Sequence, residues 1–119
     1  MPDIPCFIDP EKSPQLDLVD GIVTTILTGT HGEKMMMVRQ NIAAGAVAPM
    51  QAHPQEQVGL VLEGEGILTI GDEERRVKRG DYYCMPANVP HGAVNPGQTE
   101  FVAVEIFYPI REDFLKKIK

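Results

Sequence analysis

The sequence predicts an all-β protein, a sandwich or barrel of short strands with one short helix at its carboxyl end. Runs rich in β-branched residues recur along the chain and alternate with segments of Gly, Pro, Asn and Asp. Only residues 112–118 show a helical pattern. At 119 residues the chain is long enough for one modest core. We therefore expect an irregular amino-terminal arm over residues 1–18 and a single β-barrel domain over residues 19–119.

The expected elements follow from the order in which strand-favouring runs and turn-favouring segments occur along the chain. Four prolines disfavour regular structure in the arm. Strands are expected over residues 19–28, 35–42, 57–62, 66–70, 75–78, 81–85, 91–94 and 101–108. Residues 63–65 are expected to close a hairpin between two of these strands, because Gly64 supplies the positive φ that the turn needs. Residues 112–118 place Phe114, Leu115 and Ile118 among charged residues, which indicates a short amphipathic helix.

Two of these strands carry apolar residues on both faces. Side chains alternate along a strand, and one face of an antiparallel sheet normally meets water. Residues 57–62 and 101–108 break this rule, because each has apolar side chains on both sides. Such strands need a cover on both faces, either from the arm or from a second subunit. A homodimer is the prediction.

Composition excludes several classes of partner. The formal net charge of -6 argues against broad nucleic-acid binding, which depends on clustered Lys and Arg. No apolar run approaches the roughly 20 residues that span a bilayer, so no membrane association is expected. The first six residues lack a basic segment followed by an apolar one, as a signal peptide would have. The expected location is the cytoplasm.

Two segments combine glycines and histidines at fixed spacing. The first contains Gly45, Gln51, His53, Gln57 and Gly64, and the second contains Gly80, Pro86, Asn88, His91 and Asn95. Their order and spacing resemble the two motifs of the cupin superfamily, and together they cover about half of the chain. The resemblance implies a double-stranded β-helix, or jelly-roll, cupin barrel.

The resemblance also implies a metal site. The family's ligand positions fall on Gln51, His53, Gln57 and His91, with Gln51 in place of a His and Gln57 in place of a Glu. The implied cofactor is one divalent transition metal, namely Ni, Zn, Mn, Fe or Co. Two imidazoles with two neutral amide oxygens compensate less of the metal's charge, so weaker binding is expected. In the alternative, the two amides bond each other in a barrel that has lost its metal.

A closer resemblance is to the KdgF group of cupins, which linearise 4,5-unsaturated monouronates from pectin and alginate breakdown. It rests on His53-Pro54 followed by Gln57-Val58, and on residues 107–114. Carried over by position, the group's acidic residue falls on Glu105, where the group has Asp. Its aromatic residue falls on Phe107 and its arginine on Arg111. The implied partner is a small carboxylate-bearing substrate.

The side chains themselves agree with these roles. Glu105 is a carboxylate on an otherwise apolar strand face, which suits a general acid or base. Arg111 offers a planar fork for a substrate carboxylate, or alternatively forms a surface pair with Glu112 or Asp113. Further residues that could line the barrel are Met35, Met37, Arg39, Tyr82 and Tyr83.

The leading interpretation is a metal-dependent enzyme that acts on a small sugar acid. A metal-binding or sugar-binding module without turnover is the rival from another class. An iron-dependent dioxygenase ranks lower, because the implied ligand set lacks the two-His-one-carboxylate triad of those enzymes.

Overall fold

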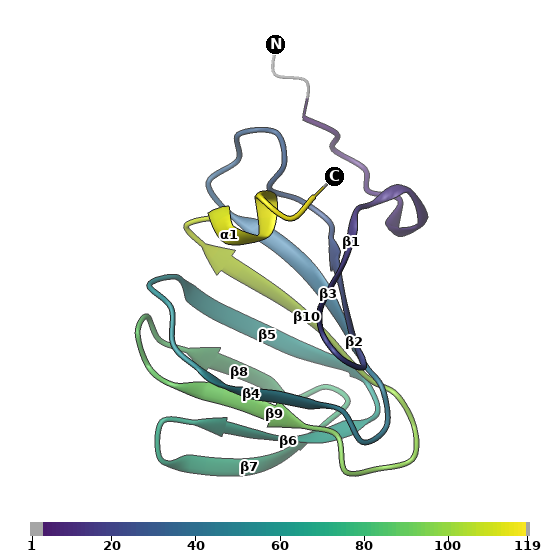
Figure 1. Cartoon of the computed structure of the whole chain (residues 1–119), viewed down its shortest axis with the longest axis vertical. Helices are drawn as coiled ribbons and strands as arrows, with labels where there is room; N and C mark the ends of the chain where they lie inside the picture. Colours follow the sequence, from purple (N-terminus) through teal and green to yellow (C-terminus); the bar gives the residue numbers. More distant parts are fainter. Residues whose placement is uncertain (1–3, 119) are drawn as a thin grey trace.

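The computed structural model describes residues 4–118, which form two antiparallel sheets that face one another (Figure 1). Short strands account for almost all of the regular structure, with one helix near the carboxyl end. The predicted double-stranded β-helix is confirmed. Among the described residues, no helix is long and apolar enough to cross a membrane.

The larger sheet has six strands in the order β1-β2-β3-β10-β5-β8. Its central strand β10 pairs with β3 on one side and with β5 on the other. The strands are β1 (Gln15–Val19), β2 (Ile22–Ile26), β3 (Met36–Ile42), β5 (Glu56–Glu63), β8 (Tyr82–Met85) and β10 (Phe101–Tyr108).

The smaller sheet has four strands in the order β4-β9-β6-β7. These strands are β4 (Val47–Gln51), β6 (Glu65–Ile70), β7 (Glu73–Lys78) and β9 (His91–Val94). A 3-10 helix, η1 (Pro10–Lys12), precedes the first strand, and the helix α1 (Glu112–Leu115) follows the last. The Tyr108–Pro109 peptide bond between β10 and α1 is cis.

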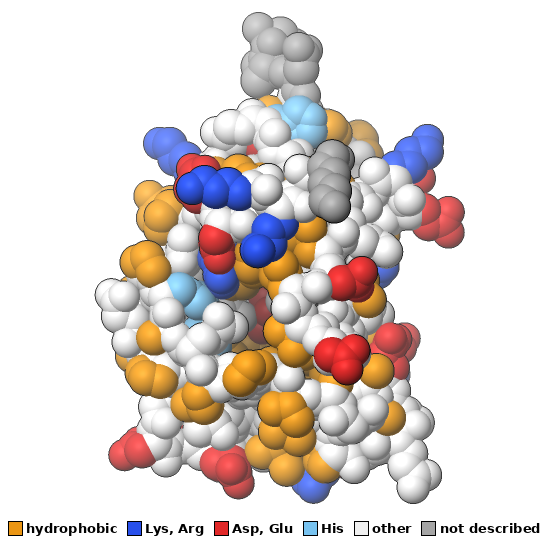
Figure 2. All heavy atoms as spheres, in the orientation of Figure 1, with side chains coloured by type: hydrophobic (Ala, Val, Ile, Leu, Met, Phe, Trp, Pro, Cys, Tyr) orange, Lys and Arg blue, Asp and Glu red, His pale blue; other side chains and the backbone are white. Residues whose placement is uncertain are grey.

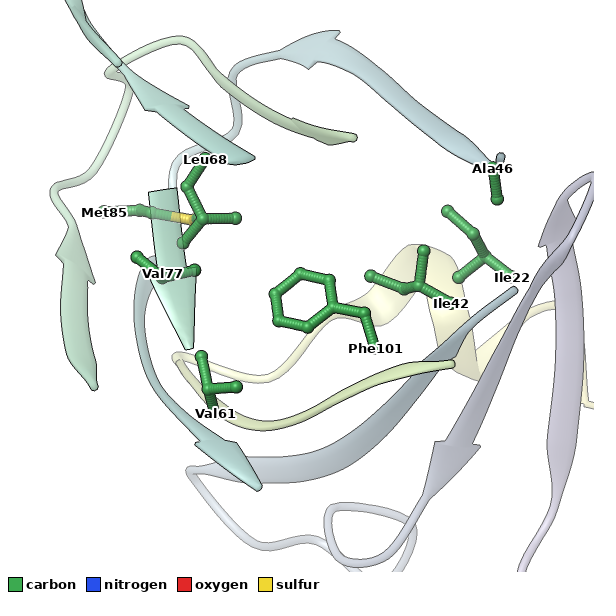
Figure 3. Packing of buried hydrophobic residues seen from close by; sticks show 8 residues of the cluster. All are labelled: Ile22, Ile42, Ala46, Val61, Leu68, Val77, Met85 and Phe101. Atoms are coloured by element: carbon green, nitrogen blue, oxygen red, sulfur yellow. The ribbon is translucent and has the colours of Figure 1, made fainter. Parts of the chain in front are cut away.

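The core lies between the inward faces of the two sheets. Phe101 on β10 is only 1% exposed and reaches across to the smaller sheet. There a Cβ built on Gly66 would lie 2.5 Å from the Phe101 ring, so the missing side chain of Gly66 makes room for the phenyl group. Figure 3 shows the apolar side chains that surround this ring. The buried residues of this core cluster are Ile22, Ile42, Ala46, Val61, Leu68, Val77, Met85 and Phe101.

A second cluster closes the end of the barrel nearest α1. Phe107 packs edge-to-face on Phe114 of the helix, with ring centroids 5.6 Å apart. The buried residues of this cluster are Leu16, Ile26, Met36, Val38, Phe107 and Phe114. Phe114 and the half-buried Leu115 of the helix pack on this cluster. The helix ends at Leu115, three residues before the predicted end.

The predicted hairpin around residues 63–65 is wrong. β5 and β6 do not pair, because both edges of β5 are already taken by β10 and β8. The chain instead passes from one sheet to the other at Gly64, where φ is +71°. A Cβ at Gly64 would clash with the carbonyl oxygen of Glu100, so the crossing needs glycine for space as well as for conformation.

The predicted arm is regular at its carboxyl end, because β1 begins at Gln15 and pairs with β2. The prolines stop at Pro14, and the alternating residues 15–18 that follow suit a strand. Asp20 and Gly21 form a turn that divides the single strand expected over residues 19–28. Residues 1–3 of the predicted arm lie outside the described part of the chain.

Phe101→Ala should destabilise the protein by about 3–5 kcal/mol, because it removes a buried aromatic ring that joins the two sheets. Phe7→Ala is the matched control, since Phe7 is 96% exposed. Urea unfolding of both variants measures the two losses. Equal losses of free energy of unfolding would contradict the assignment of Phe101 to the core.

Candidate functional site

A cavity of about 430 Å³ lies between the two sheets, beneath α1. Figure 2 shows a hollow in this face of the molecule, with histidine atoms at one side and basic side chains above it. Six of the seven predicted site residues line the cavity, namely Gln51, Gln57, His91, Glu105, Phe107 and Arg111. The seventh, His53, lies against the rings of His91 and Phe107.

The two histidines come from different parts of the chain and meet edge-to-face, with ring centroids 4.8 Å apart. His91 is the first residue of β9, whereas His53 follows the end of β4. The Nδ1 atom of His53 lies 3.1 Å from the carbonyl oxygen of Gln55, and Nδ1 of His91 lies 3.0 Å from that of Val89. A carbonyl can only accept, so Nδ1 of His91 carries the ring proton and its Nε2 has a free lone pair. His53 has an acceptor beside each ring nitrogen, since its Nε2 faces the side-chain amide oxygen of Gln57.

Gln57 brings an amide oxygen to this pair. Its Oε1 lies 3.0 Å from Nε2 of His53. Burial, followed by the charge of Arg111, lowers the pKa of His53, so a neutral ring with one N–H meets two acceptors, the oxygens of Gln55 and Gln57. One of its two ring nitrogens therefore presents a lone pair to an oxygen. With the proton on Nδ1, Nε2 of His53 and Oε1 of Gln57 are both ligand atoms that a divalent cation would accept.

Gln51 completes the predicted set from the smaller sheet. It ends β4 and pairs directly with His91 of β9, so the two side chains lie on the same face. β4 ends at Gln51, so His53 lies beyond the strand, in the segment that leads to β5. Strand β4 does not pair with β5, which carries Gln57 in the other sheet. The four predicted ligands thus come together from both sheets.

Within residues 4–118, no three His, Cys, Asp or Glu side chains are grouped so that they could hold a metal. The predicted site differs from such a group because two of its four members are amides. Any cation there would be held by imidazole nitrogens and amide oxygens, a ligand set without negative charge.

Glu105 lies in the larger sheet with only 6% of its surface exposed. The hydroxyl of Tyr83 donates to its Oε2 at 2.6 Å, and the amide of Gln40 donates to its Oε1 at 3.2 Å. The apolar strand face that carries this carboxylate faces the other sheet. Both oxygens accept hydrogen bonds from the protein, and the group still lines the cavity.

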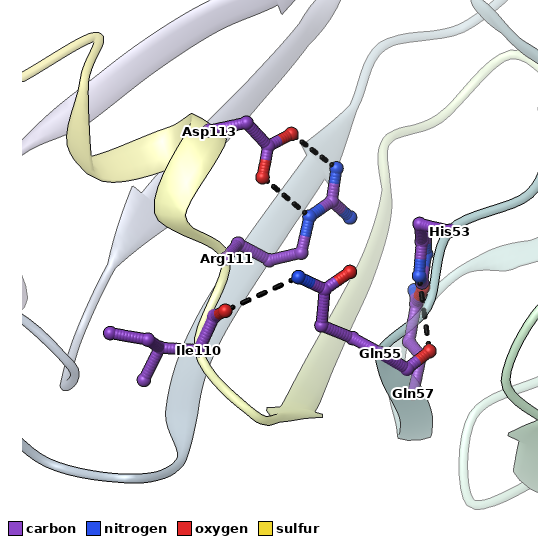
Figure 4. A network of polar contacts seen from close by, with 6 residues as sticks. All are labelled: His53, Gln55, Gln57, Ile110, Arg111 and Asp113. Atoms are coloured by element: carbon purple, nitrogen blue, oxygen red, sulfur yellow. Dashed lines mark hydrogen bonds and ion pairs between the residues drawn. The ribbon is translucent and has the colours of Figure 1, made fainter.

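Arg111 is buried, with 6% of its surface exposed, and still pairs with Asp113 (Figure 4). Its Nε and Nη2 atoms donate to the two carboxylate oxygens of Asp113 at 3.0 and 2.8 Å. This bond, followed by the positive charge of Arg111, lowers the pKa of Asp113, against the opposing effect of burial. The guanidinium also lies 4.9 Å from the Phe107 ring centre and 4.1 Å from that of Phe114.

The pairing of Arg111 with Asp113 that the sequence allowed is present, although Arg111 is buried rather than at the surface. Asp113 occupies the side edge of the guanidinium, formed by Nε and Nη2. The end edge, formed by the two Nη atoms, retains N–H groups for a second planar acceptor. Arg111 itself lines the cavity.

A match to the family model described as "Cupin domain" covers residues 38–107, more than half of the chain. The protein belongs to the cupin family. The matched region runs from β3 through β10 and contains all four predicted metal ligands.

Several relatives resemble this cupin over nearly its whole length. The pectin degradation protein KdgF of Dickeya dadantii is 36% identical over 110 residues, which cover 92% of this chain and 96% of the relative. The structure of an RmlC-like cupin from Shewanella frigidimarina superposes with a TM-score of 0.83 at 31% identity, covering 96% of this chain and 99% of the other. The structure of KdgF from Halomonas sp. gives 0.82 at 28% identity, with 93% and 99% covered.

Sequence reasoning missed some polar residues of the cupin cavity. Thr24 and Gln40 line it, and Gln55 is buried beside it, with its amide donating to the Ile110 carbonyl and its Oε1 left without a partner among the described residues (Figure 4). Gln40 stands between Val38 and Ile42 on the inward face of β3. A polar residue in an apolar row identified Glu105, and the same signal was present for Gln40.

Most of the further residues expected to line the barrel lie elsewhere. Met37 and Arg39 pair with Ile106 and Val104, on the outward face of the larger sheet. Tyr82 is 80% exposed. Of the five residues that the sequence predicted to line the barrel, Tyr83 alone lines the cavity. Side chains alternate along β8, so Tyr83 faces inward where its neighbour Tyr82 faces outward.

Proposed function

We propose that this cupin is an enzyme that opens the ring of 4,5-unsaturated monouronates, as the resemblance to KdgF implies. The observation that carries the proposal is one cavity lined by a buried carboxyl group, Glu105, and a buried cation, Arg111, close to the two-histidine cluster. The relative from Dickeya dadantii is a pectin degradation protein, and pectin is a polymer of uronates.

The proposed cofactor is one divalent transition metal, Ni, Zn, Mn, Fe or Co, held by His53, His91, Gln57 and Gln51. The lone pair on Nε2 of His91 and the contact between Nε2 of His53 and the amide oxygen of Gln57 support this set. When bound, such a metal polarises a substrate oxygen as a Lewis acid. The absence of a carboxylate from the set disfavours the iron-dependent dioxygenase.

The reaction needs a group that first takes a proton and then returns one. The hydroxyl on C1 of the ring loses its proton, the C1–O5 bond breaks, and an aldehyde forms at C1. The bonding electrons pass to O5 and give an enolate over C5 and C4, which becomes a ketone when C4 receives a proton. No atom is gained or lost. Glu105 is proposed to carry the proton, since a single carboxylate can serve both steps.

Arg111 and Phe107 are proposed to orient the substrate. The end edge of the guanidinium suits the uronate carboxylate, because two parallel N–H groups match its two oxygens. Phe107 contacts both Arg111 and His53, so its ring lies beside the cation and one of the imidazoles. The uronate carboxylate is thus proposed to bind at the Arg111 end of the cavity.

Glu105→Gln should lower turnover of unsaturated galacturonate or mannuronate by about 10²–10⁴-fold, because the amide cannot move the proton. The loss of ultraviolet absorbance as the C4=C5 bond disappears follows the reaction. Glu63→Gln is the matched control, an exposed glutamate on β5. Unchanged turnover in Glu105→Gln would contradict the assigned role, and a metal-loaded wild type without turnover would favour a binding module.

The homodimer and the cytoplasmic location remain predictions. The dimer is supported by exposed apolar side chains on the outward face of the larger sheet. Val58, Leu62 and Tyr108 are 42%, 37% and 51% exposed there, next to the half-buried Leu60, Val104 and Ile106. A contiguous apolar face of this kind is typical of an interface, and a second copy is the proposed cover.

Light scattering should give twice the 13.1 kDa mass of one chain. Val58→Lys should shift the protein toward the monomer, because it places a charge in the proposed interface. Val47→Lys, at an exposed valine of the smaller sheet, should not. A monomeric wild type at micromolar concentration would refute the dimer.

A further inference from the structure

A chain of hydrogen bonds crosses the cavity wall through four strands of the larger sheet. The hydroxyl of Thr24 on β2 donates to Oε1 of Gln40 on β3 at 2.6 Å. The amide Nε2 of Gln40 then donates to Glu105 on β10 at 3.2 Å, and the hydroxyl of Tyr83 on β8 donates to the other carboxylate oxygen at 2.6 Å. All four side chains line the cavity.

Tyr83 reaches Glu105 only because the strand between them carries a glycine. Gly59 on β5 pairs with Glu105 on one side and with Tyr83 on the other. A Cβ built on Gly59 would clash with the hydroxyl and ring atoms of Tyr83. The phenol therefore lies over the bare backbone of Gly59, and its hydroxyl bridges from β8 to β10.

Each donor in this chain is fixed in its role. Burial, then the charge of Glu105 and the hydrogen bond to it, raise the pKa of Tyr83, so its hydroxyl keeps its proton and donates. Thr24 bonds the oxygen of the Gln40 amide, which leaves the nitrogen to face Glu105. A carboxylate held by a donor on each oxygen has little freedom to rotate.

We propose that Tyr83 and Gln40 are positioning residues, which hold the Glu105 carboxylate in one orientation toward the substrate as an acceptor of protons. The inference rests on the proposed function, in which Glu105 carries the proton. Thr24 acts one step further away, by orienting Gln40. The alternative role is structural, with the same bonds only satisfying buried polar groups.

The test is Tyr83→Phe in the metal-loaded, full-length protein. The substitution retains the ring over Gly59 and removes only the hydroxyl. The kcat for unsaturated galacturonate should fall by about 10–100-fold with KM within roughly 2-fold, because a misplaced acid–base group affects the transition state more than substrate binding. Tyr82→Phe, the same change at the adjacent outward residue, should keep the wild-type kcat.

Thr24→Val is a second test of the positioning role, since valine has nearly the same shape as threonine and cannot donate a hydrogen bond to Gln40. It should also lower kcat at constant KM, by less than Tyr83→Phe. A rise in KM at unchanged kcat in Tyr83→Phe would overturn the proposal, because it would make Tyr83 a substrate-binding group. Unchanged kinetics in both Tyr83→Phe and Thr24→Val would overturn it as well.

Crystal structures of the wild type, Tyr83→Phe and Tyr82→Phe separate this inference from the proposed function. The Glu105 carboxylate should rotate away from its wild-type position in Tyr83→Phe and stay in place in Tyr82→Phe. A wild type without turnover of any unsaturated uronate contradicts the proposed function, yet this displacement would still support the positioning role. A carboxylate that does not move in Tyr83→Phe would overturn the role, whatever the wild type catalyses.

Discussion

The inward face of β10 is the constraint on which both the core and the cavity depend. The strand lies at the centre of the larger sheet and is bonded along both edges, so its register is fixed by β3 and β5 together. Its inward row is Phe101, Ala103, Glu105 and Phe107. A one-residue slip would turn the whole row outward. The packing of Phe101 therefore also fixes the position of Glu105.

The candidate site lies where the two sheets face each other. Gln51 and His91 come from the smaller sheet, whereas Gln57 and Glu105 come from the larger one. A cation bound by the first three together with His53 would link the two sheets. A ligand that binds only the folded arrangement also stabilises it, so we expect metal binding and barrel closure to support each other.

Much of this arrangement is predictable from local patterns. Alternation along residues 101–108 gives the inward face of β10, and the glycine and histidine spacing gives the order of the site residues. The partner of each strand is not a local property. Residues 57–62 and 66–70 have the pattern of a hairpin. They lie in different sheets because β10 and β8 pair with the two edges of β5, which leaves no edge for β6. The hydrogen bond from Tyr83 to Glu105 likewise needs the contact between Tyr83 and Gly59, which lie on neighbouring strands far apart in sequence.

The central claim is that a metal ion lies between the sheets, held by neutral nitrogen and oxygen ligands. Anomalous diffraction from crystals of the protein loaded with Ni, Zn or Co tests it most directly. The account predicts one strong peak about 2.0–2.2 Å from Nε2 of His53, Nε2 of His91 and Oε1 of Gln57. A peak elsewhere, or none at saturating metal, would contradict it.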